Sequence, residues 1–373
     1  MAGVRRAWFA LGFSTEEAAG QGEPEPGPRR LEPGPGGIRR LWPAWSYVVV
    51  ETGAGLEVRS AGLRQPLPGW AEALPSETHV VLRGAGSAGV WARAALRGGL
   101  RDPPAWSAAL PPGPPRPLPL LPGGFATPRP PFFTALPAGL RARQLALGNE
   151  HVLLLAAGGE VFAWGSSRHG QLGHGTLESE LEPRLVEALA GVPLQAVAAG
   201  GWHSASVSEG GDLYMWGWNE SGQLALPSKA LAEERAQAED MGAGDTMLTP
   251  HEEQPAAEPA AFITIQAFPA LLDLPQDLEV SRVSCGSRHT AVITRRARQL
   301  AMLHCGRWQM GAVSFAGGGE LYTWGWGKYG QLGHEDDASS DQPRRVQFLV
   351  TEGLWAEEVV CGPWTTYVCV LEP

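Results

Sequence analysis

The sequence predicts an all-β protein folded as a β-propeller of six or seven blades, and three observations support this prediction. Glycine supplies 49 and proline 33 of the 373 residues, which disfavours long helices because both residues are poor helix formers. Tryptophan is abundant, with 15 residues against 5 tyrosines, as expected when one tryptophan occupies a fixed place in a repeat. Finally, similar segments of about 50 residues recur along the chain, which is typical of propeller blades.

The repeat consists of a histidine, then a Trp-Gly pair, then a Gly-Gln-Leu turn. Three copies carry it, at His151 with Trp164 and Gly165, at His203 with Trp216 and Gly217, and at His289 with Trp324 and Gly325. The histidines of the first two copies are 52 residues apart, and so are their tryptophans. In the third copy the histidine and tryptophan are separated by 35 residues instead of 13. A shared period with separate insertions indicates a repeat protein with surface loops.

Each repeat position has an architectural interpretation. The tryptophan is expected to lie between neighbouring blades, beside a glycine that needs backbone freedom. The histidine is expected to pack internally or to make a turn hydrogen bond, and the leucine of the Gly-Gln-Leu turn is expected to point inward. We therefore assign these nine His, Trp and Gly residues to the fold rather than to catalysis.

The two ends of the chain are predicted to complete one blade together. Residues 359–370 match the first half of a repeat, with Thr365 in the histidine position, but no Trp-Gly strand follows them. Residues 7–13 form an apolar segment that can supply the missing strand. Such pairing would close the ring and leave no open sheet edge.

The first hundred residues are predicted to hold degenerate blades. Residues 44–50, which include Trp45, resemble the terminal segment around Trp364. One more degenerate blade is expected around residues 80–91. After subtraction of the insertions, the length favours six blades, or seven with one collapsed.

The whole chain is expected to be a single propeller, with well-formed repeats over residues 144–227 and 279–373. Residues 103–131 contain 12 prolines in 29 positions. Because proline donates no hydrogen bond to a sheet ladder, we predict a polyproline-like surface loop there. This loop is either an inert linker or a docking segment for a partner.

Two insertions interrupt the later repeats. Residues 229–260 carry eight acidic side chains against Lys229 and Arg235, which predicts a disordered acidic loop. The loop is either simply solvated or a tether for basic chromatin proteins. The segment at about residues 296–317 is either an addition from splicing or from the gene model, or a real projecting element.

Composition and motifs exclude several classes of function. A net charge of −10 disfavours a globally basic nucleic-acid binder. The four cysteines have no zinc spacing, which is consistent with a reduced intracellular protein. The sequence lacks P-loop, GxSxG, HExxH and dinucleotide-binding motifs, and no apolar run is long enough to span a membrane. We therefore expect no enzymatic activity, cofactor, metal, membrane association or small-molecule substrate.

The remaining class of function is recognition of a partner by surface loops. Two sets of positions vary between the repeats, those after each Trp-Gly pair and those just before each histidine. The candidate partner-binding residues are Arg168, His169, Trp202, Trp218, Asn219, Glu220, Arg288, Trp326, Lys328, Tyr329 and Trp364. Aromatic and Arg side chains on adjacent loops are typical of interface hot spots. The alternative is that these tryptophans simply pack between blades.

The combined pattern Gly-x-x-His, Gly-x-Leu-Tyr-x-Trp-Gly and Gly-Gln-Leu-Gly resembles the repeats of the regulator of chromosome condensation family, whose members are β-propellers. Residues 217–224, 325–334 and 361–367 carry this resemblance most specifically. It implies a non-enzymatic, chromatin-associated scaffold located in the nucleus and on chromosomes, with the cytoplasm as an alternative.

The resemblance also implies partners. The main one is a Jumonji-C oxygenase, which would hold the iron and 2-oxoglutarate, and histones or the nucleosome are a second class. The pair would influence histone lysine methylation, transcriptional repression, spindle organisation and chromosome segregation. Two alternatives stay open, a guanine-nucleotide exchange factor for a Ran-like small GTPase and a cytoplasmic adaptor linked to microtubules.

Overall fold

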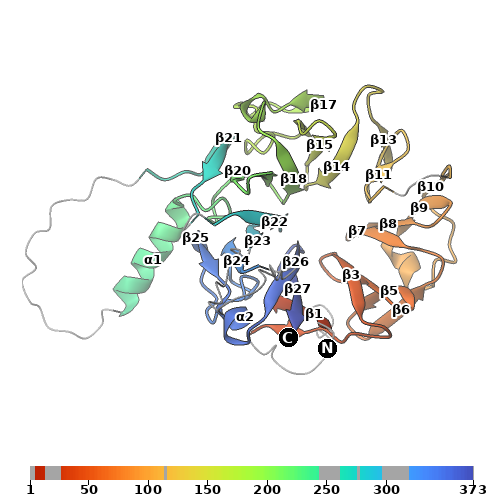
Figure 1. Cartoon of the computed structure of the whole chain (residues 1–373), viewed down its shortest axis with the longest axis horizontal. Helices are drawn as coiled ribbons and strands as arrows, with labels where there is room; N and C mark the ends of the chain where they lie inside the picture. The colour runs from red at the N-terminus through yellow and green to blue at the C-terminus, as the bar shows by residue number, and fades with distance from the viewer. Residues whose placement is uncertain are drawn as a thin grey trace, which may run out of the picture.

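The computed structural model describes residues 5–12, 27–112, 116–242, 261–274, 278–295 and 319–372. Their strands form seven antiparallel sheets, which surround a central opening like the blades of a propeller (Figure 1). The predicted all-β propeller is confirmed, and the number of blades is seven. We number the blades in chain order from Ile38, so that blade 7 joins the two ends of the chain.

The first three blades are short. Blade 1 contains β3 (Ile38–Pro43), β4 (Val48–Thr52), β5 (Gly55–Ser60) and β6 (Leu63–Leu67). Blade 2 contains β7 (Glu72–Pro75), β8 (His79–Arg83), β9 (Ser87–Ala92), the 3-10 helix η1 (Arg93–Leu96) and β10 (Trp106–Ala109). Blade 3 contains β11 (Leu120–Leu121), β12 (Gly124–Ala126) and β13 (Phe133–Ala135).

The other four blades follow the clear repeats. Blade 4 contains β14 (Ala142–Leu147), β15 (His151–Ala156), β16 (Val161–Gly165) and β17 (Glu180–Leu185), followed by the 3-10 helix η2 (Glu187–Leu189). Blade 5 contains β18 (Leu194–Ala199), β19 (His203–Ser208), β20 (Leu213–Trp218), the helix α1 (Lys229–Gly242) and β21 (Ile265–Leu272). Blade 6 contains β22 (Val280–Cys285), β23 (His289–Thr294), β24 (Leu321–Gly325) and β25 (Ser340–Arg345), followed by the helix α2 (Gln347–Thr351). Blade 7 contains β26 (Trp355–Cys361), β27 (Thr365–Glu372), β1 (Arg5–Gly12) and β2 (Arg29–Arg30).

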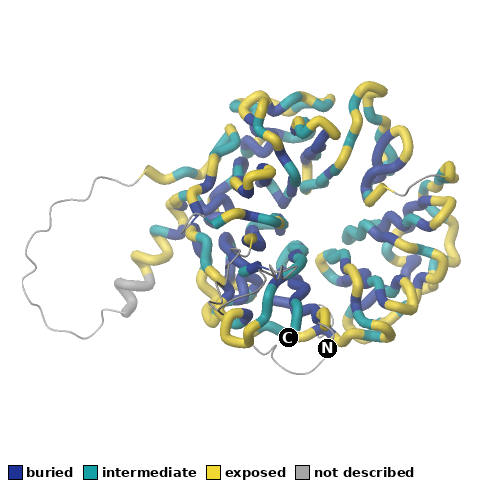
Figure 2. Tube along the Cα trace, viewed as in Figure 1, coloured by how far each residue is buried: buried dark blue, intermediate teal, exposed yellow. Residues whose placement is uncertain are grey.

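The hydrophobic core lies between the blades. The buried apolar residues fall into seven clusters, and each cluster joins two neighbouring blades. Successive side chains of a strand point to opposite faces. In β15, for example, Leu153 and Leu155 pack toward blade 5 while Leu154 packs toward blade 3. The middle strands are therefore apolar at almost every position, and Figure 2 shows burial concentrated within the ring and exposure at its rim.

The N-terminal strand closes the ring, as predicted. Strand β1 pairs with β27 along its whole length, from Arg5 opposite Glu372 to Gly12 opposite Thr365. Thr365 thus occupies the histidine position, because His289 lies opposite Gly325 in blade 6 in the same way. Both termini lie at blade 7 in Figure 1.

The repeated histidines link the blades to each other through hydrogen bonds. The same contact joins three successive pairs of blades: His151 Nε2 to Ser204 Oγ at 2.8 Å, His203 Nε2 to Thr290 Oγ1 at 3.0 Å, and His289 Nε2 to Thr366 Oγ1 at 3.0 Å. Each hydroxyl in turn donates to the carbonyl of the glutamine in the preceding Gly-Gln-Leu turn, at 2.7 to 2.8 Å. Because the hydroxyl hydrogen is used there, each neutral imidazole donates from Nε2.

The repeated tryptophans reinforce this contact. Trp216 donates from Nε1 to the carbonyl oxygen of Gln171 at 2.9 Å, and Trp324 donates to that of Gln223 at 2.9 Å. Both indoles are completely buried, as is expected of residues that lie between blades. Trp164 is also buried, against blade 3. The predicted inward direction of the turn leucines is confirmed as well, since Leu172, Leu224 and Leu332 are buried.

The proline-rich segment is not a simple loop, and this corrects the prediction. Residues 103–131 contribute β10 to blade 2 and β11 and β12 to blade 3. These strands have only two to four residues, and the prolines lie between them, where no ladder hydrogen bond is needed. Blade 3 is thus a reduced, three-stranded blade, which accounts for the difference between six and seven.

The acidic insertion also differs from the prediction in its first part. Residues 229–242 form α1, because this stretch is rich in Ala and Glu, which are good helix formers. Within this helix, Leu231 is buried and Arg235 pairs with the carboxylate of Asp341 in blade 6. The rest of this insertion and the insertion at 296–317 lie outside the described residues.

Candidate protein-interaction face

Antiparallel four-stranded blades place their loops alternately at two ends of the sheet. The loops that join the first to the second strand and the third to the fourth strand share one end. The loops that join the second to the third strand lie at the opposite end. All eleven candidate partner-binding residues lie at the first of these ends, which we call the aromatic face. The two sets of variable positions thus meet on one side of the ring.

One aromatic cluster on this face spans blades 4 to 6. The ring of Trp218 lies 5.5 Å from that of Trp202, edge to face, and 5.5 Å from that of His169. The guanidinium of Arg288 lies 4.7 Å from the centre of the Trp218 ring. Edge-to-face and cation–π contacts of this kind each contribute about 0.5–1.5 kcal/mol. The cluster is therefore pre-organised rather than a set of independent side chains.

A second aromatic cluster spans blades 6, 7 and 1. The ring centres of Trp326 and Tyr329 are 4.9 Å apart, and Trp364 lies 4.9 Å from Trp326. Trp45 lies 5.5 Å from Trp364 at an interplanar angle of 81°. Tyr329 and Trp45 are 52% and 54% exposed, so this cluster presents large apolar rings to solvent.

Trp45 was missing from the predicted set of site residues. The similarity of residues 44–50 to the segment around Trp364 was the signal for it, because both tryptophans lie in the loop between the first two strands of a blade. Because the sequence of blade 1 is degenerate, the candidate site contains no residue of its loop.

The aromatic face surrounds the mouth of a central cavity of about 1060 Å³. All seven blades line this cavity, including Trp45, Trp202, Arg288 and Trp364. The Nε1 atom of Trp364 is buried without a hydrogen-bond partner among the described residues. Because a buried N–H without a partner is costly, this atom is an unsatisfied donor in the wall of the cavity.

Several predicted site residues have other tasks. Asn219 is completely buried, and its amide holds the loop by donating to the carbonyls of Leu226 and Ile263 at 2.8 and 2.9 Å. This corrects its assignment to partner binding. Arg168 pairs with Glu150 at 3.1 Å.

Lys328 and Glu220 are exposed on the aromatic face. Lys328 pairs with Glu234 of α1, so the helix is attached beside the second aromatic cluster.

The tryptophans of the structure fall into two groups, those in the core and those on the aromatic face. Trp216 and Trp324 lie between blades, whereas the tryptophans of the two clusters are partly exposed.

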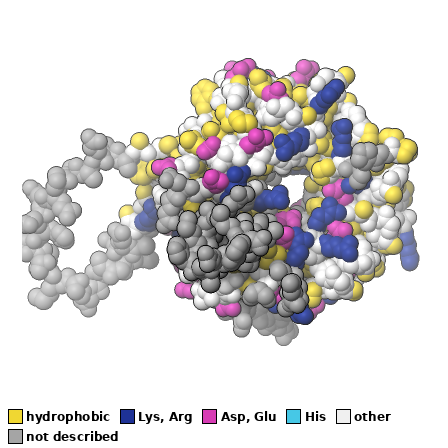
Figure 3. Space-filling view, viewed as in Figure 1, with side chains coloured by type: hydrophobic (Ala, Val, Ile, Leu, Met, Phe, Trp, Pro, Cys, Tyr) yellow, Lys and Arg dark blue, Asp and Glu magenta, His cyan; other side chains and the backbone are white. Residues whose placement is uncertain are grey.

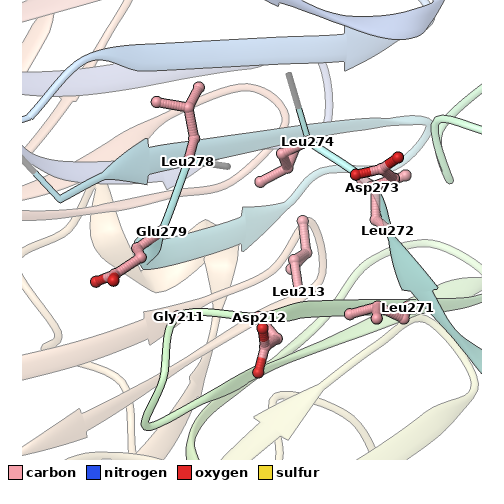
Figure 4. A pocket seen from close by; sticks show the side chains of 9 residues that line it. All are labelled: Gly211, Asp212, Leu213, Leu271, Leu272, Asp273, Leu274, Leu278 and Glu279. Atoms are coloured by element: carbon pink, nitrogen blue, oxygen red, sulfur yellow. The ribbon is translucent and has the colours of Figure 1, made fainter. Parts of the chain in front are cut away.

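A second hollow of about 290 Å³ lies at the opposite end of blade 5 (Figure 4). Leucines from β20, β21 and the connection to blade 6 form its wall, with the carboxylates of Asp212, Asp273 and Glu279 around them. Its nine lining residues include no His, Cys, Ser, Lys or Arg. Apart from the carboxylates, they therefore provide none of the usual nucleophiles or general bases.

The described residues offer little other chemistry. Within them, no group of three or more His, Cys, Asp or Glu side chains could hold a metal ion. Burial raises the pKa of the Cys361 and Cys369 thiols to about 12, so neither is an activated thiolate at neutral pH. No helix in this part of the chain is both long and apolar enough to cross a membrane.

Comparison with known proteins agrees with this architecture. The profile described as regulator of chromosome condensation (RCC1) repeat matches residues 158–207, 210–293 and 318–369, and a second profile of the same repeat matches residues 142–171 and 195–223. The human RCC1 domain-containing protein 1 is 44% identical over 391 aligned residues, which cover 98% of this chain and 97% of that protein. The chain belongs to the RCC1 repeat family.

Other RCC1 relatives extend the comparison. The mouse RCC1 domain-containing protein 1 is also 44% identical, over 98% of this chain and 97% of its own length. Among solved structures, Prp20p from Saccharomyces cerevisiae covers 99% of this chain and 92% of its own, with a TM-score of 0.66 at 14% identity. That structure is described together with the binding of Prp20p to Gsp1p and histones. At this identity the likeness shows the RCC1 propeller fold.

Proposed function

We propose that this RCC1-repeat protein is a non-enzymatic interaction scaffold that binds a protein partner through its aromatic face. The observation that carries the proposal is the arc of partly exposed tryptophan, tyrosine and arginine side chains on neighbouring loops. Trp, Tyr and Arg dominate the energetics of protein–protein interfaces, and rings that already pack on each other lose little entropy on binding.

We further propose that the partner is a Jumonji-C oxygenase and that histones belong to the same assembly. The support is the family resemblance, together with the histone binding described for Prp20p. In this arrangement the oxygenase would hold the iron and 2-oxoglutarate and act on histone lysine methylation. The scaffold would work in the nucleus, with effects on transcriptional repression, spindle organisation and chromosome segregation.

Affinity purification from dividing cells, followed by mass spectrometry, tests this proposal. We expect the wild-type chain to recover a Jumonji-C oxygenase and histones, and Trp326→Ala/Tyr329→Ala to lose about tenfold or more of the oxygenase, because hot-spot truncations cost at least about 2 kcal/mol. The matched control is Phe268→Ala/Leu271→Ala, which removes two side chains that are 53% and 60% exposed on the outer strand β21. Absence of any such oxygenase, or an equal loss in the control, would count against the proposal.

Exchange-factor activity toward a Ran-like GTPase is the second candidate, because the fold matches that of Prp20p over nearly the whole chain. The insertion between β23 and β24 lies outside the described residues. A nucleotide-release assay distinguishes the two candidates. Stimulated release would make exchange the leading function, whereas unchanged release together with recovery of the oxygenase would support the scaffold.

A further inference from the structure

Most described arginines on the outer strands have a carboxylate partner. Arg344 on β25 pairs with Asp336 at 2.9 Å, and Arg30 on β2 pairs with Glu372 at 2.7 Å. Four exposed arginines at the central opening differ, because their side chains make no hydrogen bond or ion pair with any described residue: Arg39, Arg141, Arg143 and Arg282.

These four arginines lie at or beside the start of an innermost strand. Arg39 belongs to β3, Arg143 to β14 and Arg282 to β22, and Arg141 directly precedes β14. The innermost strands begin at the end of the ring that is opposite the aromatic face. Figure 3 shows Lys and Arg side chains bordering the central opening on the viewed face, with some Asp and Glu side chains between them. Both lysines of the chain, Lys229 and Lys328, lie near α1 instead.

Three arginines from different blades act on one carboxyl group. Burial of Glu358 on β26 raises its pKa, while Arg6, Arg282 and Arg40 act in the opposite direction. Arg6 and Arg40 are neutralised by their own partners, since Arg6 pairs with Glu357 and Arg40 with Glu51, both at 2.6 Å. Arg282 faces Glu358 without a direct ion pair, and Arg39, Arg141 and Arg143 have no hydrogen-bond or ion-pair partner among the described residues, so the positive charge around the opening is only partly compensated.

From this arrangement the geometry points to a binding site for an extended acidic peptide segment of another protein at this opening, separate from the aromatic face. The guanidinium fork matches a carboxylate in a bidentate manner, and Arg is the preferred residue for such recognition. A peptide can place separate carboxylates opposite the separate arginines.

Nucleic acid fits this opening less well. Its continuous phosphate backbone would also meet Glu357 and Glu358, which lie at the start of β26. A net charge of −10 further opposes long-range attraction of a polyanion. Discrete carboxylates on a flexible peptide avoid the first difficulty, and a short peptide carries less charge than a polynucleotide, which reduces the second.

Fluorescence anisotropy at low ionic strength tests this inference on the full chain. The probe is a short labelled peptide of alternating Glu and Ser, compared with the same peptide carrying Gln in place of Glu and with labelled oligothymidine. The variant is Arg143→Gln/Arg282→Gln. Glutamine fits both positions, because the equivalent residues of other blades are glutamines. Gln195 of blade 5 occupies the same bulge position as Arg143 of blade 4, and Gln144 of blade 4 occupies the same position as Arg282 of blade 6. The matched control, Arg97→Gln/Arg101→Gln, removes two exposed arginines from blade 2 that also lack partners among the described residues.

We expect the wild-type chain to bind the Glu peptide and not the Gln peptide. The Arg143→Gln/Arg282→Gln variant should bind about tenfold or more weakly, and the control within about twofold of wild type. Thermal melting of each variant shows whether its fold is intact. The inference is wrong if the wild-type chain does not bind the Glu peptide, if the control loses as much affinity, or if oligothymidine binds more tightly with the same dependence on these arginines.

Discussion

Removal of residues 1–12 is expected to abolish cooperative folding of the propeller. Strand β1 lies between β27 and β2 within blade 7, and Ala7 to Leu11 are all buried. Ala7, Phe9 and Leu11 pack toward blade 6, whereas Trp8 and Ala10 pack toward blade 1. Loss of the three large side chains alone costs about 5–9 kcal/mol of burial, which is comparable to the whole stability of a typical protein of about 5–15 kcal/mol. Soluble yield, size-exclusion profile and a thermal melt measure the effect.

A circular permutant distinguishes the effect of removing strand β1 from the effect of changing where the chain begins. Because Arg5 lies opposite Glu372, a short glycine linker from Glu372 to Arg5 converts β27 and β1 into an ordinary hairpin. We expect this permutant, with new ends in the exposed turn at Ala61 and Gly62 between β5 and β6, to melt cooperatively. A truncated chain that melts as the full chain does would contradict the closing role of β1.

Acidification from about pH 7.5 to about pH 5 is expected to destabilise the protein strongly through its buried histidines. Burial lowers the pKa of His151 and His203 to about 3 and that of His289 to about 4, whereas an unfolded histidine titrates near pH 6.5. The unfolded chain therefore binds more protons, so this stability is fully present above pH 6.5 and falls as the pH decreases toward 3 to 4. At about pH 5 the loss is on the order of 2 kcal/mol for each histidine. Urea unfolding at both pH values measures it.

The variant His203→Gln is the control for this mechanism. Glutamine can still donate to Thr290 but cannot take up a proton in this pH range. We expect the variant to be less stable at neutral pH but to lose about 1 kcal/mol per pH unit less on acidification. An unchanged slope would mean that other groups, such as paired carboxylates, account for the acid sensitivity.

The clear repeats could be predicted because their signals are local and periodic. A histidine, a Trp-Gly pair and a Gly-Gln-Leu turn recur in the same order in three copies. The contact between His203 and Thr290 is therefore repeated by His151 and His289, and the contact between Trp216 and Gln171 is repeated by Trp324. The closing strand was also predictable, since residues 359–370 lacked a partner and residues 7–13 were the apolar segment available to them.

The candidate site was only partly predictable. The loops were identified by their variability, but Trp45 was missed, and Asn219 was included although it is buried and holds its own loop. A variable loop residue and a loop-fixing residue look alike in sequence, because the difference lies in which backbone carbonyls come within hydrogen-bonding distance.

By itself, the sequence determined the repeat, the type of blade and the joining of the two chain ends, because each depends on residue spacing. Only the tertiary structure decided the number of blades, since strands as short as Leu120–Leu121 carry no periodic pattern and exist only because neighbouring blades bury both of their faces. It also decided which side chains gather on the aromatic face and around the central opening. Those residues are distant in the chain, and closure of the ring is what brings their loops and strand ends together.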